Sequence, residues 1–247
     1  MATGEARRRI SANLARIEAR IARACAQAGR ERREVTLVAV TKTRTWDEVL
    51  AAHACGLRHF GENRVEELET RLPKARTSLG QELPTWHMIG HIQSRKAARA
   101  VAISDLIHSV DSLRLAERLD RAAAEAGRTL PVLLEINVSG EAAKYGFDAA
   151  TAGPEDALVA ELARLEGLAH LSVQGLMTMA PIVADAEQAR PVFGRLRLLR
   201  ERLQRELAFS GWHELSMGMT DDYVIAIQEG ATLVRIGRAI FEPQDQA

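Results

Sequence analysis

Lys42 stands directly after a run of residues that predicts a strand buried on both faces. Residues 35–41 read Val-Thr-Leu-Val-Ala-Val-Thr and carry no charge, a pattern that is typical of parallel sheets covered by helices. Ligands of parallel α/β proteins lie at the carboxyl ends of the strands. A lysine amine held there against apolar walls loses its proton more easily than a surface amine, and it can attack a carbonyl to form an imine.

Lysine is scarce in this chain, and its scarcity supports amine chemistry at position 42. Of the 33 basic residues only four are lysines, at positions 42, 74, 96 and 144. Arginine supplies general positive charge but keeps its proton at working pH, so it cannot form a Schiff base. A solvated lysine at a strand end is the alternative interpretation. Lys144, in the polar loop 139–147, could be a second amine, although such a lysine is more often solvated.

Two glycine-containing turns near the end of the chain form a second candidate site. Residues 216–220 read Ser-Met-Gly-Met-Thr, and Gly237 with Arg238 follows the last predicted strand. Small residues let backbone amides approach an anion, and a helix that begins near Asp221 would add its dipole. In closed barrels these two loops often bind phosphate. Asp221 and Asp222 would repel an anion unless they face away.

A lysine after the first strand and a phosphate site after the last two strands are neighbours only if the sheet closes. Together they predict a phosphorylated aldehyde or ketone held as an imine, which describes both pyridoxal phosphate and a sugar-phosphate substrate of an aldolase. Arg235 should point into the barrel, where a ring nitrogen or carboxylate of a ligand, or an internal acid, would have to pair with it. Asn63 could bind a ring hydroxyl or cap a helix. His87 and His91 lie near one strand end, but no further metal-binding motif supports a metal site.

Hydrophobic periodicity predicts eight strands that alternate with helices. The strands are expected at residues 35–41, 57–60, 85–90, 106–110, 131–138, 171–177, 213–217 and 232–236. An amphipathic helix over 5–29 precedes them, the helix after the second strand should end near Leu72, and residues 76–83 should form a loop. Strict alternation implies a parallel sheet, and eight units in 247 residues fit a closed TIM (β/α)8 barrel. We therefore expect one domain over 1–247, with 1–30 as a flanking helix; an open doubly wound sheet is the rival.

Composition narrows the classes of function. The net charge is zero and no run of five like charges occurs, which argues against nucleic acid or a membrane surface as the main partner. The two cysteines form no CxxC motif, so a reducing cytoplasm is the simplest setting. The first ten residues are charged, and we expect neither a secretory signal nor a membrane span.

Several longer motifs resemble one family. These are Val40-Thr41-Lys42-Thr43, Phe60-Gly61-Glu62-Asn63, residues 86–96 (WHMIGHIQSRK), residues 175–180 (GLMTMA), residues 215–222 (LSMGMTDD) and residues 234–241 (VRIGRAIF). In this order, and over nearly the whole chain, they are similar to the pyridoxal phosphate homeostasis proteins, also called proline synthase co-transcribed or alanine racemase N-terminal-like proteins.

The resemblance implies a barrel like the N-terminal domain of alanine racemase (fold type III of pyridoxal phosphate proteins), with pyridoxal 5′-phosphate bound as a Schiff base to Lys42. It implies phosphate contacts from the loops around positions 216–219 and 237–238, and Arg235 facing the pyridine nitrogen. The expected cofactor-binding residues are Lys42, Asn63, His87, Ser216, Met217, Gly218, Met219, Arg235, Gly237 and Arg238. The chain departs from the family at Arg238, often a small hydroxyl residue, and at Glu242, usually glycine; the second change should affect only the tail.

The same resemblance leaves catalysis open. Alanine racemase uses a second domain and a tyrosine of the partner subunit, whereas this chain ends at Ala247 and contains only Tyr145 and Tyr223. Racemisation needs an acid and a base on both faces of the cofactor. We therefore expect a cytoplasmic, monomeric protein that buffers pyridoxal phosphate and hands it transiently to apo-enzymes, with Lys144 as a possible acceptor during exit. A weak amino-acid racemase or Schiff-base lyase is the alternative.

Overall fold

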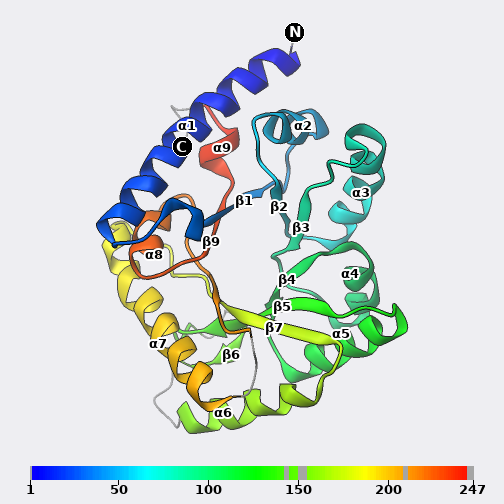
Figure 1. Ribbon diagram of the computed structural model, residues 1–247, viewed down its shortest axis with the longest axis vertical. Coiled ribbons are helices and arrows are strands. Elements are labelled where there is room, and N and C mark those ends of the chain that lie inside the picture. Colours follow the sequence, from blue (N-terminus) through cyan, green and yellow to red (C-terminus); the bar gives the residue numbers. More distant parts are fainter. Residues whose placement is uncertain (1, 142–144, 150–154, 208–210, 244–247) are drawn as a thin grey trace.

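The computed structural model describes residues 2–141, 145–149, 155–207 and 211–243. Lys144, the second amine predicted above, lies outside these residues. Within the described part of the chain, eight parallel strands close into a barrel, because β4 pairs with β5 as well as with β3 (Figure 1). The closed barrel expected from the alternation of strands and helices is confirmed, and the open sheet is excluded.

All eight predicted strands are present and in the predicted order. They are β1 (Thr36–Val40), β2 (His59–Glu62), β3 (Thr85–Met88), β4 (Leu106–Val110), β5 (Leu130–Asn137), β7 (Leu171–Met177), β8 (Glu214–Ser216) and β9 (Leu233–Ile236). Around the barrel the order is β1, β2, β3, β4, β5, β7, β8, β9, and β9 pairs with β1. The carboxyl ends of all these strands therefore lie at one end of the barrel, where the predicted site residues follow them.

Helices surround the strands (Figure 1). The α-helices are α1 (Ala2–Gln27), α2 (Trp46–Ala54), α3 (Val65–Leu79), α4 (Ala97–Ile103), α5 (Leu113–Glu125), α6 (Glu155–Ala163), α7 (Arg190–Glu206), α8 (Tyr223–Gln228) and α9 (Arg238–Phe241). Short 3-10 segments lie at Arg32–Glu34, Ser94–Lys96, Arg164–Gly167 and Ala186–Ala189. A capping box between Thr45 and Glu48 begins α2.

Two expectations about connections were wrong. α3 does not end near Leu72 but continues through Pro73 to Leu79, so residues 76–79 are helical rather than loop. The polar segment after β5 contains a two-residue strand, β6 (Phe147–Asp148), which pairs with β5. In both cases local sequence signals pointed to a loop, and contacts with neighbouring elements decided otherwise.

The barrel separates two apolar cores. A small interior cluster comes from five strands and consists of Val38, Leu106, Leu133, Met177 and Leu233. The larger core lies between the outer face of the strands and the helices, and it contains residues such as Phe60, Trp86 and Phe193. Because side chains alternate along a strand, residues two positions after the interior cluster also face inward. Arg235, His108 and Glu135 hold such positions in β9, β4 and β5.

The N-terminal helix flanks the barrel rather than plugging it. α1 packs against α2, α8 and α9 (Figure 1), and its buried face includes Ile10, Ile17 and Ile21. Among the described residues, none of the helices combines the length and the apolar character that crossing a membrane would require.

Candidate functional site

Closure of the barrel brings Lys42 beside the two glycine-containing loops. β1 pairs with β9 and β9 pairs with β8, so the ends of these three strands are neighbours. A Cβ added at Gly237 would lie 3.3 Å from the carbonyl oxygen of Val40, which places the loop after β9 directly against the end of β1. The Lys42 side chain is exposed. The apolar walls expected around this amine are therefore not present.

Lys42 sits in a tight turn whose backbone is held from behind. The Arg44 amide donates to the Thr41 carbonyl at 3.0 Å, and Thr43 has a φ of 64°, a left-handed conformation that β-branched residues rarely adopt. Arg71 of α3 donates from Nη2 to the carbonyls of Thr41 and Arg44, at 2.8 and 3.0 Å. One buried guanidinium thus grips the backbone on both sides of the lysine.

Arg71 is itself fixed by a buried carboxylate. Its Nε donates to Glu62 Oε1, which also accepts from Thr41 Oγ1 at 2.6 Å. Glu62 has no solvent exposure and Arg71 has 8%. Burial raises the pKa of Glu62 to about 7, against the lowering effects of Thr41 and Arg71. Glu62 lies in the Phe60–Asn63 motif, so this motif supports the lysine turn as well as leading to Asn63.

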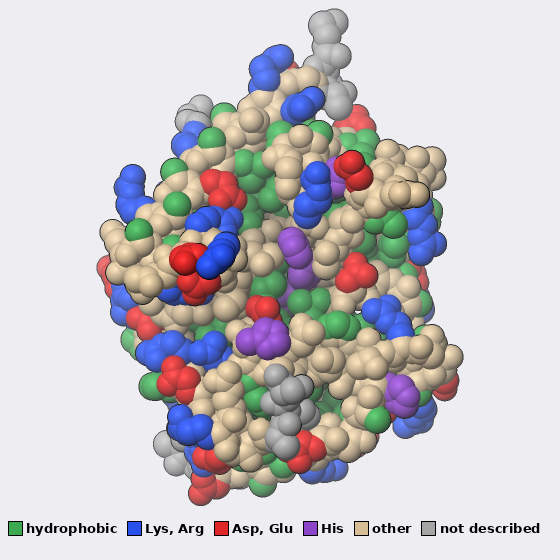
Figure 2. All heavy atoms as spheres, viewed as in Figure 1, with side chains coloured by type: hydrophobic (Ala, Val, Ile, Leu, Met, Phe, Trp, Pro, Cys, Tyr) green, Lys and Arg blue, Asp and Glu red, His purple; other side chains and the backbone are tan. Residues whose placement is uncertain are grey.

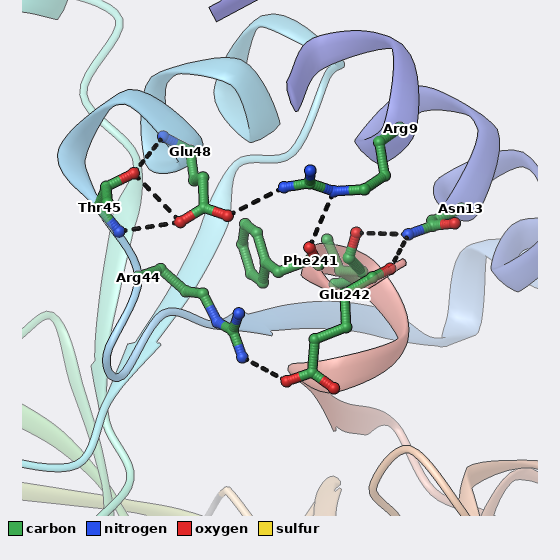
Figure 3. A network of polar contacts seen from close by, with 8 residues as sticks. Arg9, Asn13, Arg44, Thr45, Glu48, Phe241 and Glu242 are labelled. Carbon is green, nitrogen blue, oxygen red and sulfur yellow. Dashed lines mark hydrogen bonds and ion pairs between the residues drawn. The ribbon is translucent and has the colours of Figure 1, made fainter. Parts of the chain in front are cut away.

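The other side of the turn is tied to the end of the chain. Arg44 Nη2 lies 2.6 Å from Glu242 Oε1, and its guanidinium stands 5.7 Å from the centre of the Phe241 ring. Figure 3 shows both residues facing Arg44. The expectation that Glu242 affects only the tail is therefore wrong: its carboxylate contacts the loop that carries Lys42.

Helix α1 also holds the end of the chain in place, because its side chains bind the backbone around α9 (Figure 3). Arg9 donates from Nε to the Phe241 carbonyl and from Nη2 to Glu48 Oε1, both at 3.1 Å. Asn13 Nδ2 donates to the carbonyls of Ile240 and Glu242, each at 2.9 Å. Because α9 begins directly after Gly237, α1 links the loop after β9 to α2, which follows the lysine turn.

The loop after β8 turns at Gly218 and packs closely on α8. Gly218 has a φ of 92°, and a Cβ there would lie 2.5 Å from the Cβ of Ala226, so only glycine fits. The amide of Met219 donates to Asp222 Oδ1 at 2.6 Å. Asp222 therefore turns back onto its own loop, and burial raises the pKa of its carboxyl.

Arg238 crosses between the two loops. Its Nη2 lies 2.5 Å from Asp221 Oδ2, so a cation lies beside the acid that was expected to repel an anion. The side chain of Met217 belongs to the outer core, and its amide donates to the Leu233 carbonyl. The side chain and N–H of Met217 are thus committed to the fold.

Arg235 points into the barrel, as its place in β9 predicted, and its pairing is fully internal. Nη1 donates to Ser216 Oγ at 2.6 Å and Nη2 to the Thr178 carbonyl at 2.9 Å. Burial lowers the pKa of Arg235 to about 10, while the carboxylates of Asp222 and Glu135 act in the opposite direction. The guanidinium remains charged at neutral pH and stabilises negative charge near Ser216.

Glu135 is an interior acid that the sequence reasoning missed. It is 4% exposed, and burial together with the Asp111 carboxylate raises its pKa to about 7, although Arg235 lowers it. A signal existed in the sequence: an acidic residue stands within the apolar run of β5, where alternation places it inside the barrel.

The two histidines of the 86–96 motif separate into different environments. His87 is 2% exposed, and its two ring nitrogens bond to His59 and His108, so it lies in the barrel interior rather than at the mouth. His91 bonds through Nδ1 to Asp111 at 2.8 Å, and its ring stacks on Tyr145 with centres 3.9 Å apart. Over the residues that the structure describes, no group of three or more metal-ligating side chains occurs.

Replacing Arg71 with methionine tests the support of the lysine turn. The change removes one hydrogen-bond donor from the buried Glu62 carboxyl and one from each of the Thr41 and Arg44 carbonyls, so we expect a loss of about 3–5 kcal/mol in the free energy of unfolding. Arg99→Met removes an exposed pair with Glu69 and should cost less than about 1 kcal/mol. Urea unfolding of both variants measures the difference. Equal losses would contradict the support that we assign to Arg71.

The raised pKa of Glu135 predicts a dependence of stability on pH. Between its ordinary value of 4.5 and about 7, the folded protein retains a proton that the unfolded chain has lost. The contribution of this group to stability therefore falls as the pH rises through this window. Glu135→Gln should reduce the decline between pH 5 and pH 8 by roughly 2–3 kcal/mol, measured by urea unfolding. The exposed change Glu117→Gln should leave the decline as in the parent protein, and an unaltered decline in Glu135→Gln would disprove the assignment.

Comparison with known proteins agrees with this geometry. A profile of the family described as "Alanine racemase, N-terminal domain" matches residues 12–244. The pyridoxal phosphate homeostasis proteins of Aquifex aeolicus and Pseudomonas aeruginosa are 39% and 40% identical, covering 92% and 96% of this chain and 95% and 96% of theirs.

Solved structures extend the likeness to three dimensions. PipY of Synechococcus elongatus with PLP bound has a TM-score of 0.80 and 36% identity, over 94% of this chain and all of that chain. Alanine racemase from Streptomyces coelicolor shares the fold alone, with a TM-score of 0.67 and 19% identity over 95% of this chain and 58% of that chain. The chain therefore belongs to the alanine racemase N-terminal domain family and, within it, to the pyridoxal phosphate homeostasis proteins.

Proposed function

We propose that this protein binds pyridoxal 5′-phosphate and serves intracellular homeostasis of the cofactor by holding it reversibly, buffering it and delivering it. The observation that carries the proposal is the adjacency of β1, β9 and β8, which gathers one lysine and two anion-suited loops at one end of the barrel. The complex of PipY with PLP and the names of the curated relatives support the same ligand.

The residues at this end suit the chemistry of the cofactor. Lys42 would hold it covalently through its amine, and the loops after β8 and β9 would hold its phosphate. Asn63 Oδ1 is buried without a hydrogen-bond partner among the described residues, so a ligand hydroxyl would satisfy it. Arg235 would meet the pyridine nitrogen as a cation. The cofactor's ring supplies an electron sink when bound, and a guanidinium beside its nitrogen would weaken that sink.

Release and delivery form the finer part of the proposal. An exposed amine in a turn on the barrel mouth gives the cofactor a reversible attachment that water and other amines can reach. We place the protein in the cytoplasm as a monomer that meets apo-enzymes transiently, with the whole chain acting as one ligand-binding domain. The recipients would be enzymes that require the same cofactor.

Cofactor loading of the purified protein tests the site. We expect a yellow protein whose adduct, fixed by borohydride reduction, maps to the peptide that contains Lys42. Lys42→Ala should abolish the adduct, whereas Lys74→Ala, which removes an exposed lysine of α3, should retain it. A protein that cannot be loaded, or an adduct at another lysine in the parent protein, would refute the proposal.

Catalysis by the same site is the second candidate, because one aromatic pair lies near the mouth. Tyr223 is buried at 1% exposure beneath Arg20 of α1, so it cannot serve the exposed side of a cofactor. Tyr145 is 56% exposed and stacks on His91, whose partner is Asp111. These groups could supply the opposing acid and base that a racemase needs.

Exchange of the α-proton of L-amino acids with deuterium separates the carrier from the racemase. For a carrier we expect exchange no faster in the loaded protein than with free pyridoxal phosphate. Exchange at enzymatic rates, lost in both Lys42→Ala and His91→Phe, would establish the catalytic function instead. Mass spectrometry of the recovered amino acids provides the measurement.

A further inference from the structure

Three histidines form a continuous hydrogen-bonded chain through the barrel interior. His59 Nδ1 lies 3.0 Å from His87 Nε2, and His87 Nδ1 lies 2.8 Å from His108 Nε2. The chain ends at Ser216, whose Oγ lies 2.8 Å from His108 Nδ1. Because β4 and β8 are not neighbours in the sheet, the last of these bonds crosses the barrel. The site end of the molecule is thus connected to the amino end of β2.

Each of these imidazoles is neutral, and this restricts the histidine chain to two arrangements of its hydrogens. Burial lowers the pKa of His87 to about 3 and holds that of His108 well below its usual range. Burial also lowers the pKa of His59, although the Glu214 carboxylate opposes the shift. A neutral imidazole carries one N–H, so one nitrogen donates and the other accepts. The direction of one bond therefore sets the next: all three rings carry hydrogen on Nε2, or all three carry it on Nδ1.

The two forms present different groups at Ser216. Arg235 Nη1 donates to Ser216 Oγ at 2.6 Å, and a guanidinium can only donate. With hydrogen on Nε2 of the rings, His108 Nδ1 accepts and the Ser216 hydroxyl must donate to it. With hydrogen on Nδ1, His108 donates to Ser216, and the hydroxyl hydrogen is left for a third partner such as an anion in the loop after β8.

Charges at the two ends favour the first form in the ligand-free protein. Arg235 acts on His108 as a nearby cation, and Glu214 acts on His59 as a nearby anion. Hydrogen on Nε2 moves positive charge away from the guanidinium and towards the carboxylate. Asp222 and Glu135 also face Arg235, but the pKa of each carboxyl is raised by burial, which limits how far they offset the cation.

We propose that His108, His87 and His59 are positioning residues for Ser216, and that an anion bound at the loop after β8 reverses the chain so that all three rings carry hydrogen on Nδ1. The proposal rests on the phosphate site of the proposed function. The bound phosphate monoanion gives a proton to Ser216 Oγ and becomes the dianion. One proton then passes along each hydrogen bond, and His59 Nε2 releases one to water. The three rings are neutral before and after the transfer, and the histidine chain gains no charge.

Through this reversal, an anion bound at the mouth changes the tautomer of His59 at the opposite end of the barrel. His59 is the first residue of β2 and is only partly buried, whereas His87 and His108 are enclosed. Figure 2 shows histidine side chains reaching the surface near the centre of one face of the molecule. Because His59 is the partly exposed ring of the three, it is the member of the histidine chain through which solvent exchanges the proton.

Nitrogen-15 NMR of histidine-labelled protein tests the chain, because Nδ1–H and Nε2–H rings give different patterns of nitrogen shifts. We expect Nε2–H at all three rings in the ligand-free protein and Nδ1–H at all three with saturating inorganic phosphate. His170, partly exposed beside Asp120, serves as the control ring and should not change. Mixed tautomers along the chain, or an unchanged His59 with phosphate bound, would overturn the proposal.

Two variants distinguish proton transfer along the histidine chain, which we call the relay, from the contact between Ser216 and the anion. Ser216→Ala removes the hydroxyl donor and should weaken phosphate binding by roughly three- to tenfold. His108→Asn keeps a polar group beside Ser216 but cannot reach His87, so phosphate should bind while His59 and His87 no longer respond. A response of His59 in folded His108→Asn would refute the relay. If the cofactor loads on Lys42 without any change of tautomer, this inference fails and the proposed function stands; if neither phosphate nor cofactor binds, both fail.

Discussion

The pairing of β9 with β1 is the constraint on which the site depends. Without it, the lysine after the first strand and the loop after the last would stand at opposite edges of a sheet. With it, Val40 and Gly237 come within contact distance, and the loop after β8 is one strand further along. Closure also creates an interior in which side chains from strands far apart in sequence can bond across the barrel.

That interior is divided between apolar and polar groups. Five apolar side chains fill one part, while Arg235, Ser216 and the histidine chain occupy another. Buried polar groups are tolerated when each finds a partner, because an unpaired one costs the full desolvation penalty. The hydrogen bonds of Arg235 to a hydroxyl and a carbonyl meet that requirement. Its positive charge remains available to a ligand bound at the mouth of the barrel.

The lysine turn is held from two sides by different kinds of interaction. Arg71 grips its backbone from the buried side, where a lost partner is costly. Arg44 and Glu242 tie it to α9 in a partly exposed pair, where each bond contributes little by itself. The combination suits a site that must place an amine reproducibly and still let a ligand enter and leave. Arg9 and Asn13 extend the outer tie to α1.

The sequence alone determined the eight strands, their order and closure, and the places of Lys42, Arg235 and the two glycine loops. These follow from periodicity and residue type, which act locally or repeat along the chain. The tertiary structure decided which side chains meet. His59 and His108 belong to separate strands. Arg71 belongs to a segment that the sequence predicts only as a charged helix, and Glu242 follows the last helix. Their partners depend on strand tilt, register and helix docking, which bring distant residues together and which no local pattern encodes. The same dependence placed the ring of His87 inside the barrel and the side chain of Met217 in the outer core.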